Sequence, residues 1–350
     1  MVPGGILMNN QNQEEKTMKK ILAFALALMM ALSLTAALAD DVPAPKSPLR
    51  YSAAGGSSGG NFYVVAAGVA SYLNQKLPEY FNWTAEETGG GTANLVMIQN
   101  GEAEIGVAMT SSIEEAFKGE ADWTHGVKME NLRGLVPLYP SYLTIYSLAS
   151  TGAKQLTDLN GKVVGLGSKG AAMDSVFRDA FPKMNITPAS IFNDGHGATA
   201  TAVGAGQVDV AVLFSLPPFA AITELEAGKD LTFVGLSEEE QKFLCDNYSF
   251  YSPATMPAGS YKGVTEDLTT VSEWNMLVTS CEVPEEYVYL ITKTLLESDG
   301  ALVEYYKGLT YMVAENELSF NCPLHAGTVR YLKEIGMELP AELIPAEYAE

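Results

Sequence analysis

Short apolar stretches alternate along the chain with stretches whose apolar residues recur at the helical period. Residues 49–54 are predicted as a strand, and the residues from 61 onward as a helix with one apolar face. That face is made by Phe62, Val65, Val69, Tyr72 and Leu73. Further strands are predicted at 81–87 and 104–109, each followed by a helix. Three successive strand–loop–helix units therefore open the folded part of the chain.

A second block repeats this order. Strands are predicted at 163–166, 191–192 and 208–214, with helices at 172–181 and from the loop 193–199 to 205, the first ending at Pro182. The strings GEAEIGV and GQVDVAV occupy equivalent places in the two blocks. Helices are also predicted at 285–298, 302–307 and 325–335, and extended crossings near 142–148 and 251–271. We expect two α/β lobes of similar plan, with a ligand between lobes that can close on it.

Small polar residues follow the predicted strands where each strand ends. The run GGSSGG at 55–60 has the composition of a flexible linker, but it stands between a strand and an amphipathic helix, which favours a ligand-holding loop. The loop TGGGTAN and the turn TSSIE follow the next two strands. We predict Thr92 as a helix N-cap, and Ser111 with Glu114 as a capping box. Helix N-termini at this edge of a sheet suit anionic ligands.

The sequence supports a catalytic role for these loops less well than ligand binding. The string GLGSKG at 165–170 matches a dinucleotide fingerprint, but the acidic residue expected about 20 positions on falls in a glycine-rich loop instead of ending a second strand. Serines in the loops lack a recognisable His and acid partner, so we expect helix capping or ligand contacts, and no enzyme. Lys169 is the one cation in the six predicted loops, and we expect it to pair with a ligand carboxylate. Tyr63 is predicted to line the cleft between the lobes, whereas we expect His196 to pack within its loop.

Composition limits location and partners. A basic start at 18–20, an apolar run at 21–38 and the small-residue ending ALA predict a signal peptide cleaved after Ala39, although such a run could also just span a membrane. The full chain carries a net charge of −21, and loss of residues 1–39 leaves 18 basic and 40 acidic residues. This charge argues against nucleic acid and anionic membranes as partners. Three cysteines leave one bridge possible, and three scattered histidines predict no metal site; no cofactor is expected.

Ordered strings across the mature chain resemble the TAXI family, the solute-binding subunits of one class of TRAP transporters. They are GGSSGGNFYVVAAGVASYLN, EETGGGTANLVMIQNGEAEIGVAMTSSIEEAFKG, DLNGKVVGLG, AGQVDVAVLF, MPAGSYKGVTEDLTTV, EEYVYLITKTLLE and PLHAGTVRYLKEIG. The resemblance implies a two-lobed periplasmic-binding-protein fold of the second type, without catalysis. It implies capture of glutamate, 2-oxoglutarate or a related carboxylate outside the cell, and delivery to TRAP membrane permease subunits.

The family's ligand loops transfer by position to four stretches of this chain. The ligand-binding residues so predicted are Ser57, Ser58, Gly60, Asn61, Tyr63, Gly91, Thr92, Asn94, Met109, Thr110, Ser111, Ser168, Lys169, Ala171 and Met173. Several depart from the family pattern: Ala171 to Met173 stand where Ser-Gly-Thr is usual, which removes two hydroxyls. A less polar or differently shaped carboxylate is therefore an alternative ligand.

The complete expectation is a periplasmic or extracytoplasmic monomer of class α/β. Residues 1–39 are a leader and signal peptide, 40–141 with 256–350 form lobe 1, and 142–255 form lobe 2. The alternative function is a ligand-sensing module that reports to a membrane receptor.

Overall fold

The computed structural model describes residues 42–58 and 60–349, and the chain from Lys46 onward forms one compact unit. The predicted leader and signal peptide lie outside the described residues. Within the described part of the chain, no helix is both long and apolar enough to cross a membrane. All three cysteines lie in this part, and all are free thiols.

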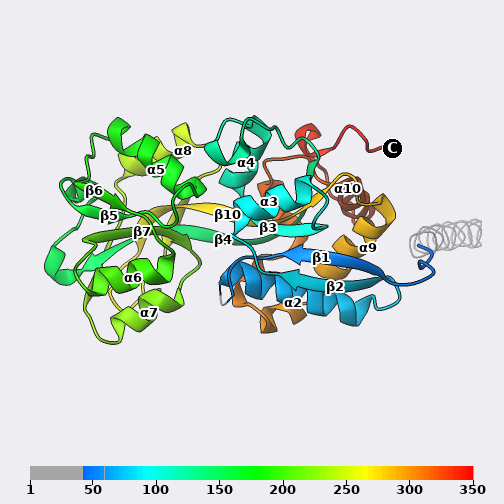
Figure 1. Ribbon diagram of the computed structural model, residues 1–350, viewed down its shortest axis with the longest axis horizontal. Coiled ribbons are helices and arrows are strands. Elements are labelled where there is room, and N and C mark those ends of the chain that lie inside the picture. The colour runs from blue at the N-terminus through cyan, green and yellow to red at the C-terminus, as the bar shows by residue number, and fades with distance from the viewer. Residues whose placement is uncertain (1–41, 59, 350) are drawn as a thin grey trace, which may run out of the picture. The chain divides into compact units, whose positions relative to one another are not determined.

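The strands of the described chain form one sheet with two halves of the same plan (Figure 1). One half has the order β2-β1-β3-β10-β4, and the other has β6-β5-β7-β4-β8. The strands of the first half are β1 (Leu49–Ala54), β2 (Phe81–Glu86), β3 (Ile105–Met109), β4 (Leu132–Leu148) and β10 (Leu268–Ser280). The second half contains β5 (Val163–Gly165), β6 (Ser190–Phe192), β7 (Val210–Ser215) and β8 (Leu231–Val234), while β9 (Ser252–Met256) pairs with β10.

Pairing directions are also the same in the two halves. β1 is parallel to β2 and β3, as β5 is parallel to β6 and β7. β10 is antiparallel to β3 and β4, and β4 is antiparallel to β7 and β8. β4 belongs to both halves, because its first part pairs with β10 and its last residues pair with β7 and β8. This repeated order confirms the prediction of two α/β lobes in a periplasmic-binding-protein type of fold.

Helices follow most strands. They are α2 (Asn61–Lys76), α3 (Gly91–Gln99), α4 (Thr110–Lys118), α5 (Ala172–Lys183), α6 (His196–Gly204), α7 (Ala220–Glu226), α8 (Glu238–Asn247), α9 (Glu285–Leu296) and α10 (Ala326–Glu334). The helix predicted at 302–307 is wrong: this region contains the short 3-10 turns Ala301–Glu304 and Lys307–Tyr311. α5 also continues through Pro182 into its last turn instead of stopping there.

Two predicted helix caps are wrong as well. Gly90, not Thr92, is the N-cap of α3, and it has a φ of 106°, a conformation that glycine adopts readily. Met109 is the N-cap of α4, so Ser111 lies inside the first turn and forms no capping box with Glu114. The N–H of Ser111 instead donates to a carboxylate 162 positions away, on Glu273.

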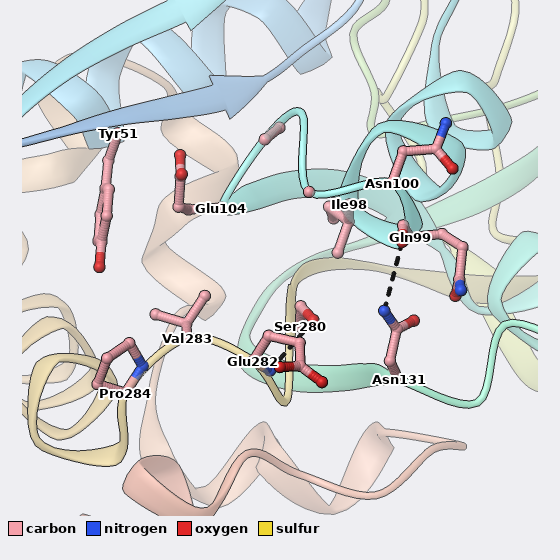
Figure 2. Close-up of a pocket in the computed structure, with 12 residues that line it drawn as sticks. Tyr51, Ile98, Gln99, Asn100, Glu104, Asn131, Ser280, Glu282, Val283 and Pro284 are labelled. Atoms are coloured by element: carbon pink, nitrogen blue, oxygen red, sulfur yellow. Dashed lines mark hydrogen bonds between the residues drawn. The ribbon is translucent and has the colours of Figure 1, made fainter.

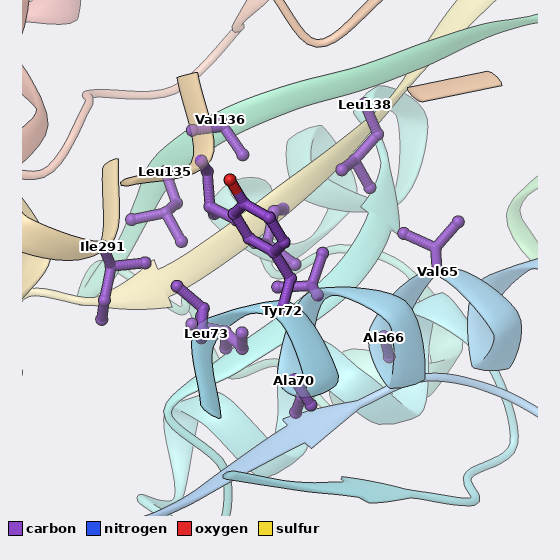
Figure 3. Close-up of a cluster of buried hydrophobic side chains, with 14 of the residues drawn as sticks. Val65, Ala66, Ala70, Tyr72, Leu73, Leu135, Val136, Leu138 and Ile291 are labelled. Carbon is purple, nitrogen blue, oxygen red and sulfur yellow. The ribbon is translucent and has the colours of Figure 1, made fainter. Parts of the chain in front are cut away.

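Each lobe has its own apolar core. In lobe 1, α2 buries one face against β4 and α9, as Figure 3 shows for Tyr72, Leu73, Leu135 and Ile291. Lobe 2 has one cluster around Phe177 and Leu244 and another around Val203 and Ile222. Burying an aliphatic or aromatic side chain of this size stabilises the fold by about 1.5–3 kcal/mol. These cores hold the strand ends, and hence the loops after them, in fixed positions.

Candidate functional site

In lobe 1, the loops after the strands are tied together by Asn94. Its side-chain amide donates to the carbonyl oxygens of Gly55, at 2.6 Å, and Val107, at 2.7 Å. The amide oxygen accepts from the Thr88 hydroxyl at 2.6 Å, and that hydroxyl accepts from Gly90 N at 3.0 Å. Asn94 is fully buried. Asn94 therefore holds these loops together from inside the lobe, and its predicted contact with a ligand stays a prediction.

Gly55 lets its loop lie directly on the first turn of α2. A Cβ at this position would stand 2.8 Å from Tyr63 Cα, a backbone atom that cannot move aside. Gly56 is also close to α2, because a Cβ added at this position would stand 3.3 Å from Phe62 Cβ. The glycine-rich run is thus a packed loop and not a flexible linker over its described residues.

Four strand-end helices begin without a side-chain cap. Among the described residues, the N-cap residues of α2 and α3 in lobe 1, and of α5 and α6 in lobe 2, form no side-chain cap hydrogen bond, although the N–H of Gly90 donates to the Thr88 hydroxyl and that of Gly195 to the Asp194 carboxylate. The first N–H groups of a helix have no partner within the helix, and they favour an anion. Two lobes therefore each present helix N-termini at the carboxyl ends of parallel strands, the edge where open α/β sheets bind ligands.

In lobe 2, the loop that carries Lys169 is held by a buried acid. Asp174 accepts from Gly170 N at 3.1 Å and from Arg178 Nε at 2.8 Å, and Asn193 donates to it at 3.0 Å. Asn193 also donates to the carbonyl oxygen of Gly167 at 3.0 Å, which joins the loops after β5 and β6. The Lys169 side chain itself is exposed at the tip of this loop. Its charge can therefore reach a solute.

His196 packs within the loops of lobe 2, as predicted. A Cβ on Gly167 would stand 2.8 Å from the imidazole Cε1, and the Phe219 ring meets the imidazole edge-on at 6.2 Å between centroids. Burial lowers the pKa of His196 below its usual 6.5. His196 is therefore neutral near pH 7 and adds no cation to this edge.

Two contacts join the two lobes near these loops, and a third contact stabilises the lobe 1 side. Met109, at the end of β3, packs against the lobe 2 core, and Leu216 of lobe 2 packs against the lobe 1 core. On the lobe 1 side, the Asn61 amide donates to the Tyr306 hydroxyl at 3.1 Å, and Tyr306 packs against Tyr139 of β4 with ring centroids 4.9 Å apart. Sequence reasoning missed Tyr306, because it lies between two 3-10 turns where no apolar period marks a face.

The remaining predicted residues divide by exposure. Exposed in the loops are Ser57, Ser58, Ser168 and Lys169; partly exposed are Gly60, Asn61, Tyr63, Gly91, Thr92, Met109, Ala171 and Met173; buried are Thr110 and Ser111. Their contact with a ligand stays a prediction.

A pocket of about 350 Å³ lies at the other end of lobe 1 (Figure 2). It is lined by residues from the end of α3, the start of β3 and the end of β10, among them Gln99, Glu104 and Ser280. Tyr51 of β1 lies beside Glu104 in this pocket. The pocket is thus at the amino ends of β1 and β3, away from the loops described above.

The chain belongs to the NMT1-like family, whose model matches residues 53–336 and so includes both lobes. This is a family of solute-binding proteins of the periplasmic-binding-protein type, which bind small molecules for transporters.

Several solved structures are similar in fold at low sequence identity. The alkanesulfonate-binding protein SsuA from Xanthomonas axonopodis pv. citri has 17% identity and a TM-score of 0.47, with 83% of this chain and 85% of that chain covered. A binding protein component of an ABC phosphonate transporter from Pseudomonas aeruginosa has 11% identity and a TM-score of 0.48, with 85% and 92% covered. The probable amino-acid ABC transporter extracellular-binding protein ytmK from Bacillus subtilis has 15% identity and a TM-score of 0.46, with 75% and 98% covered.

Proposed function

We propose that this protein captures a small organic acid or acidic amino acid, similar to glutamate or 2-oxoglutarate, outside the cytoplasmic membrane and delivers it to a TRAP-type importer. The observation that carries the proposal is the set of four uncapped helix N-termini, two from each lobe, at the carboxyl ends of the strands. The resemblance of the loops to the TAXI family supports the TRAP assignment.

We expect the ligand carboxylate to bind at these helix N-termini, with the N-terminus of α5 among them. Lys169 stands in the loop directly before α5 and is exposed, so its ammonium group can approach an anion held there. Among the described residues, no carboxylate forms an ion pair with Lys169 that would compete with a ligand.

The ligand also carries an apolar part. Met109 at the end of β3 and Met173 in the first turn of α5 come from different lobes, and both pack at the edge of the lobe 2 core. Phe62 lies beside Gly91 on the lobe 1 side: a Cβ added to Gly91 would stand 3.5 Å from the Phe62 ring. Flexible thioether side chains accommodate irregular apolar groups, so we expect a carboxylate with a short hydrocarbon chain.

The test is a thermal-shift screen of residues 40–350 against glutamate, 2-oxoglutarate, C4 dicarboxylates, and branched-chain or aromatic acids. A ligand at 100 times its dissociation constant stabilises the protein by about 2.7 kcal/mol, which moves the melting point by a few degrees. We expect a shift with one class of acid, and a weaker shift in Lys169→Ala. The matched control is Lys229→Ala, an exposed lysine at the end of α7.

The outcomes separate the parts of the proposal. A shift that Lys169→Ala abolishes and Lys229→Ala leaves intact supports the cation and the carboxylate together. A shift that survives in both variants keeps solute capture and moves the anion to the helix N-termini alone. No shift with any acid contradicts the proposed ligand class.

A further inference from the structure

A buried glutamate lies where the two lobes meet. Glu273 is on β10, directly opposite Ser141 of β4, and only 2% of its surface is exposed. Its carboxylate accepts the N–H of Ser111 at 3.3 Å, and Ser111 belongs to the first turn of α4 in lobe 1. The same turn supplies two of the predicted ligand-binding residues, so Glu273 holds part of the solute site from inside the fold.

The groups that cover Glu273 come from both lobes. Tyr251, which precedes β9 on the lobe 2 side, is buried, and the nearby Glu273 carboxylate contributes to raising its pKa; the Tyr251 hydroxyl has no hydrogen-bond partner among the described residues. Close by, the Ser249 hydroxyl of lobe 2 donates to Glu114 of α4 at 2.6 Å. A movement of lobe 2 away from α4 would therefore break these contacts and admit water to Glu273.

The electrostatic surroundings give Glu273 little support for a negative charge. Burial raises its pKa to about 8, and this outweighs the opposing effect of Ser111. Glu115 of α4 raises the pKa further, and Tyr248 lies next to Tyr251 with ring centroids 5.9 Å apart. Among the described residues, no Lys, Arg or His side chain contributes to this pKa.

We propose that Glu273 is a positioning residue of the solute site, and that its proton couples lobe closure to pH. When the lobes are closed on each other, the carboxyl group is buried and protonated, and α4 is held against lobe 2. When the lobes separate, water reaches the group and the proton leaves. Protonation alone therefore shifts the solute-free protein toward the closed state. This inference rests on the proposed function, because solute capture is the event that the proton would regulate.

The sign of the coupling follows from proton linkage. The buried Glu273 of this structure, in which α4 contacts lobe 2, has a pKa of about 8, and we assign this arrangement to the closed state; an open, hydrated glutamate has a pKa of about 4.3. Low pH therefore favours closure. Between about pH 5 and 8, the affinity for a solute that selects the closed state should fall up to tenfold for each pH unit, with the uptake of up to one proton on binding.

The first experiment needs no solute. The radius of gyration of residues 40–350 is measured by small-angle X-ray scattering from pH 6 to 9 for the wild type, Glu273→Gln and Glu104→Gln. We expect the wild type to open as the pH rises through 8, and Glu273→Gln to keep its low-pH value throughout. Glu104→Gln, a half-buried acid at the distant pocket, should respond like the wild type.

A wild type whose radius of gyration does not change with pH overturns the proposal, whether or not the variants fold. A pH response that Glu273→Gln retains also overturns it. With a solute in hand, calorimetry at pH 7 in phosphate and in Tris should show proton uptake by the wild type and none by Glu273→Gln. Solute binding without proton uptake would overturn this coupling and leave the proposed function standing.

Discussion

The side-chain amide nitrogen of Asn94 lies 2.6 Å from the carbonyl oxygen of Gly55 and donates a hydrogen bond to it, although 39 positions separate the two residues. The same amide also donates to the carbonyl oxygen of Val107, so one side chain fixes the end of β1 and the middle of β3 relative to α3. The shape of the lobe 1 loops therefore depends on a residue that has no exposed surface.

Replacement of Asn94 by Ala should lower the free energy of unfolding by roughly 3 kcal/mol. Two buried carbonyl groups lose their partner, and each such loss costs about 1–3 kcal/mol. Urea unfolding measures the change. Asn100→Ala is the control and should cost little, because among the described residues the side chain of Asn100, the C-cap of α3, donates only to exposed Glu102. Equal losses in the two variants would mean that Asn94 does not organise the loops.

Gly55→Ala should weaken both the fold and solute binding. The new Cβ would press on Tyr63 Cα at 2.8 Å, and overpacking of this kind typically costs about 1–3 kcal/mol. Gly89→Ala, in the neighbouring loop, meets only the Ala93 side chain at an ordinary 3.5 Å and serves as the control. Melting temperature and solute affinity are compared for the two variants. Normal affinity in Gly55→Ala would show that the contact between this loop and α2 does not shape the site.

His325 should make the protein sensitive to mild acid. Its Nδ1 accepts from Gly327 N at 3.1 Å as the N-cap of α10, and its Nε2 lies 3.0 Å from Val283 O, so the neutral ring is the bonded form. Burial lowers its pKa to about 4. Below about pH 6.5, the pKa of a histidine in the unfolded chain, His325 is protonated in the unfolded chain but stays neutral in the native state. The free energy of unfolding therefore falls as the pH drops toward 4.

Each pKa unit corresponds to about 1.4 kcal/mol, so this group should remove about 2 kcal/mol between pH 6.5 and 5. His325→Asn keeps an acceptor for the cap and removes the titration, so its loss over that range should be smaller by this amount. His125→Asn, at an exposed turn, is the control. Parallel urea curves for wild type and His325→Asn at both pH values would contradict the assignment.

Glu317 should lower the stability of the protein as the pH rises, which is the opposite pH dependence to that of His325. It is fully buried, neither carboxylate oxygen has a partner among the described residues, and burial raises its pKa well above its usual range. The native state therefore holds a proton that the unfolded chain releases above about pH 4.3, so the group costs stability as the pH rises. The stability of Glu317→Met relative to the wild type should increase by about 1 kcal/mol or more from pH 5 to 8.

The control is Glu315→Met, an exposed acid in the same 3-10 turn, whose effect should not change with pH. Urea unfolding at the two pH values measures both variants. A Glu317→Met effect that is constant between pH 5 and 8 would show that the carboxyl group does not titrate as proposed.

Much of the fold could be predicted from apolar periodicity. The predicted strand at 49–54 and the helix face built on Val65, Val69 and Leu73 match β1 and α2. The helix was predictable because these three side chains recur at the helical period and are all fully buried. The long crossing strands were predicted only in part. β4 begins at Leu132 and not near 142, since it packs in both lobes and its apolar run shows no alternation.

The chemistry of the site was harder to predict, because its polar partners are distant in sequence. Ser111 matches a capping pattern locally, yet its N–H bonds to Glu273 on a strand that the local pattern does not reveal. Asn94 has the sequence position of a ligand residue and the contacts of a structural one. No local signal marks Tyr306, whose importance comes from its contact with Asn61.

Loops from both lobes should hold one small carboxylate. The most direct measurement is hydrogen-exchange mass spectrometry of residues 40–350 with and without the acid that gives the largest thermal shift. We predict slower exchange on binding at 55–63 and 88–94 in lobe 1, together with 167–173 and 193–199 in lobe 2. Slower exchange confined to one lobe, or to residues 98–104 and 280–284 around the pocket of Figure 2, would contradict the account.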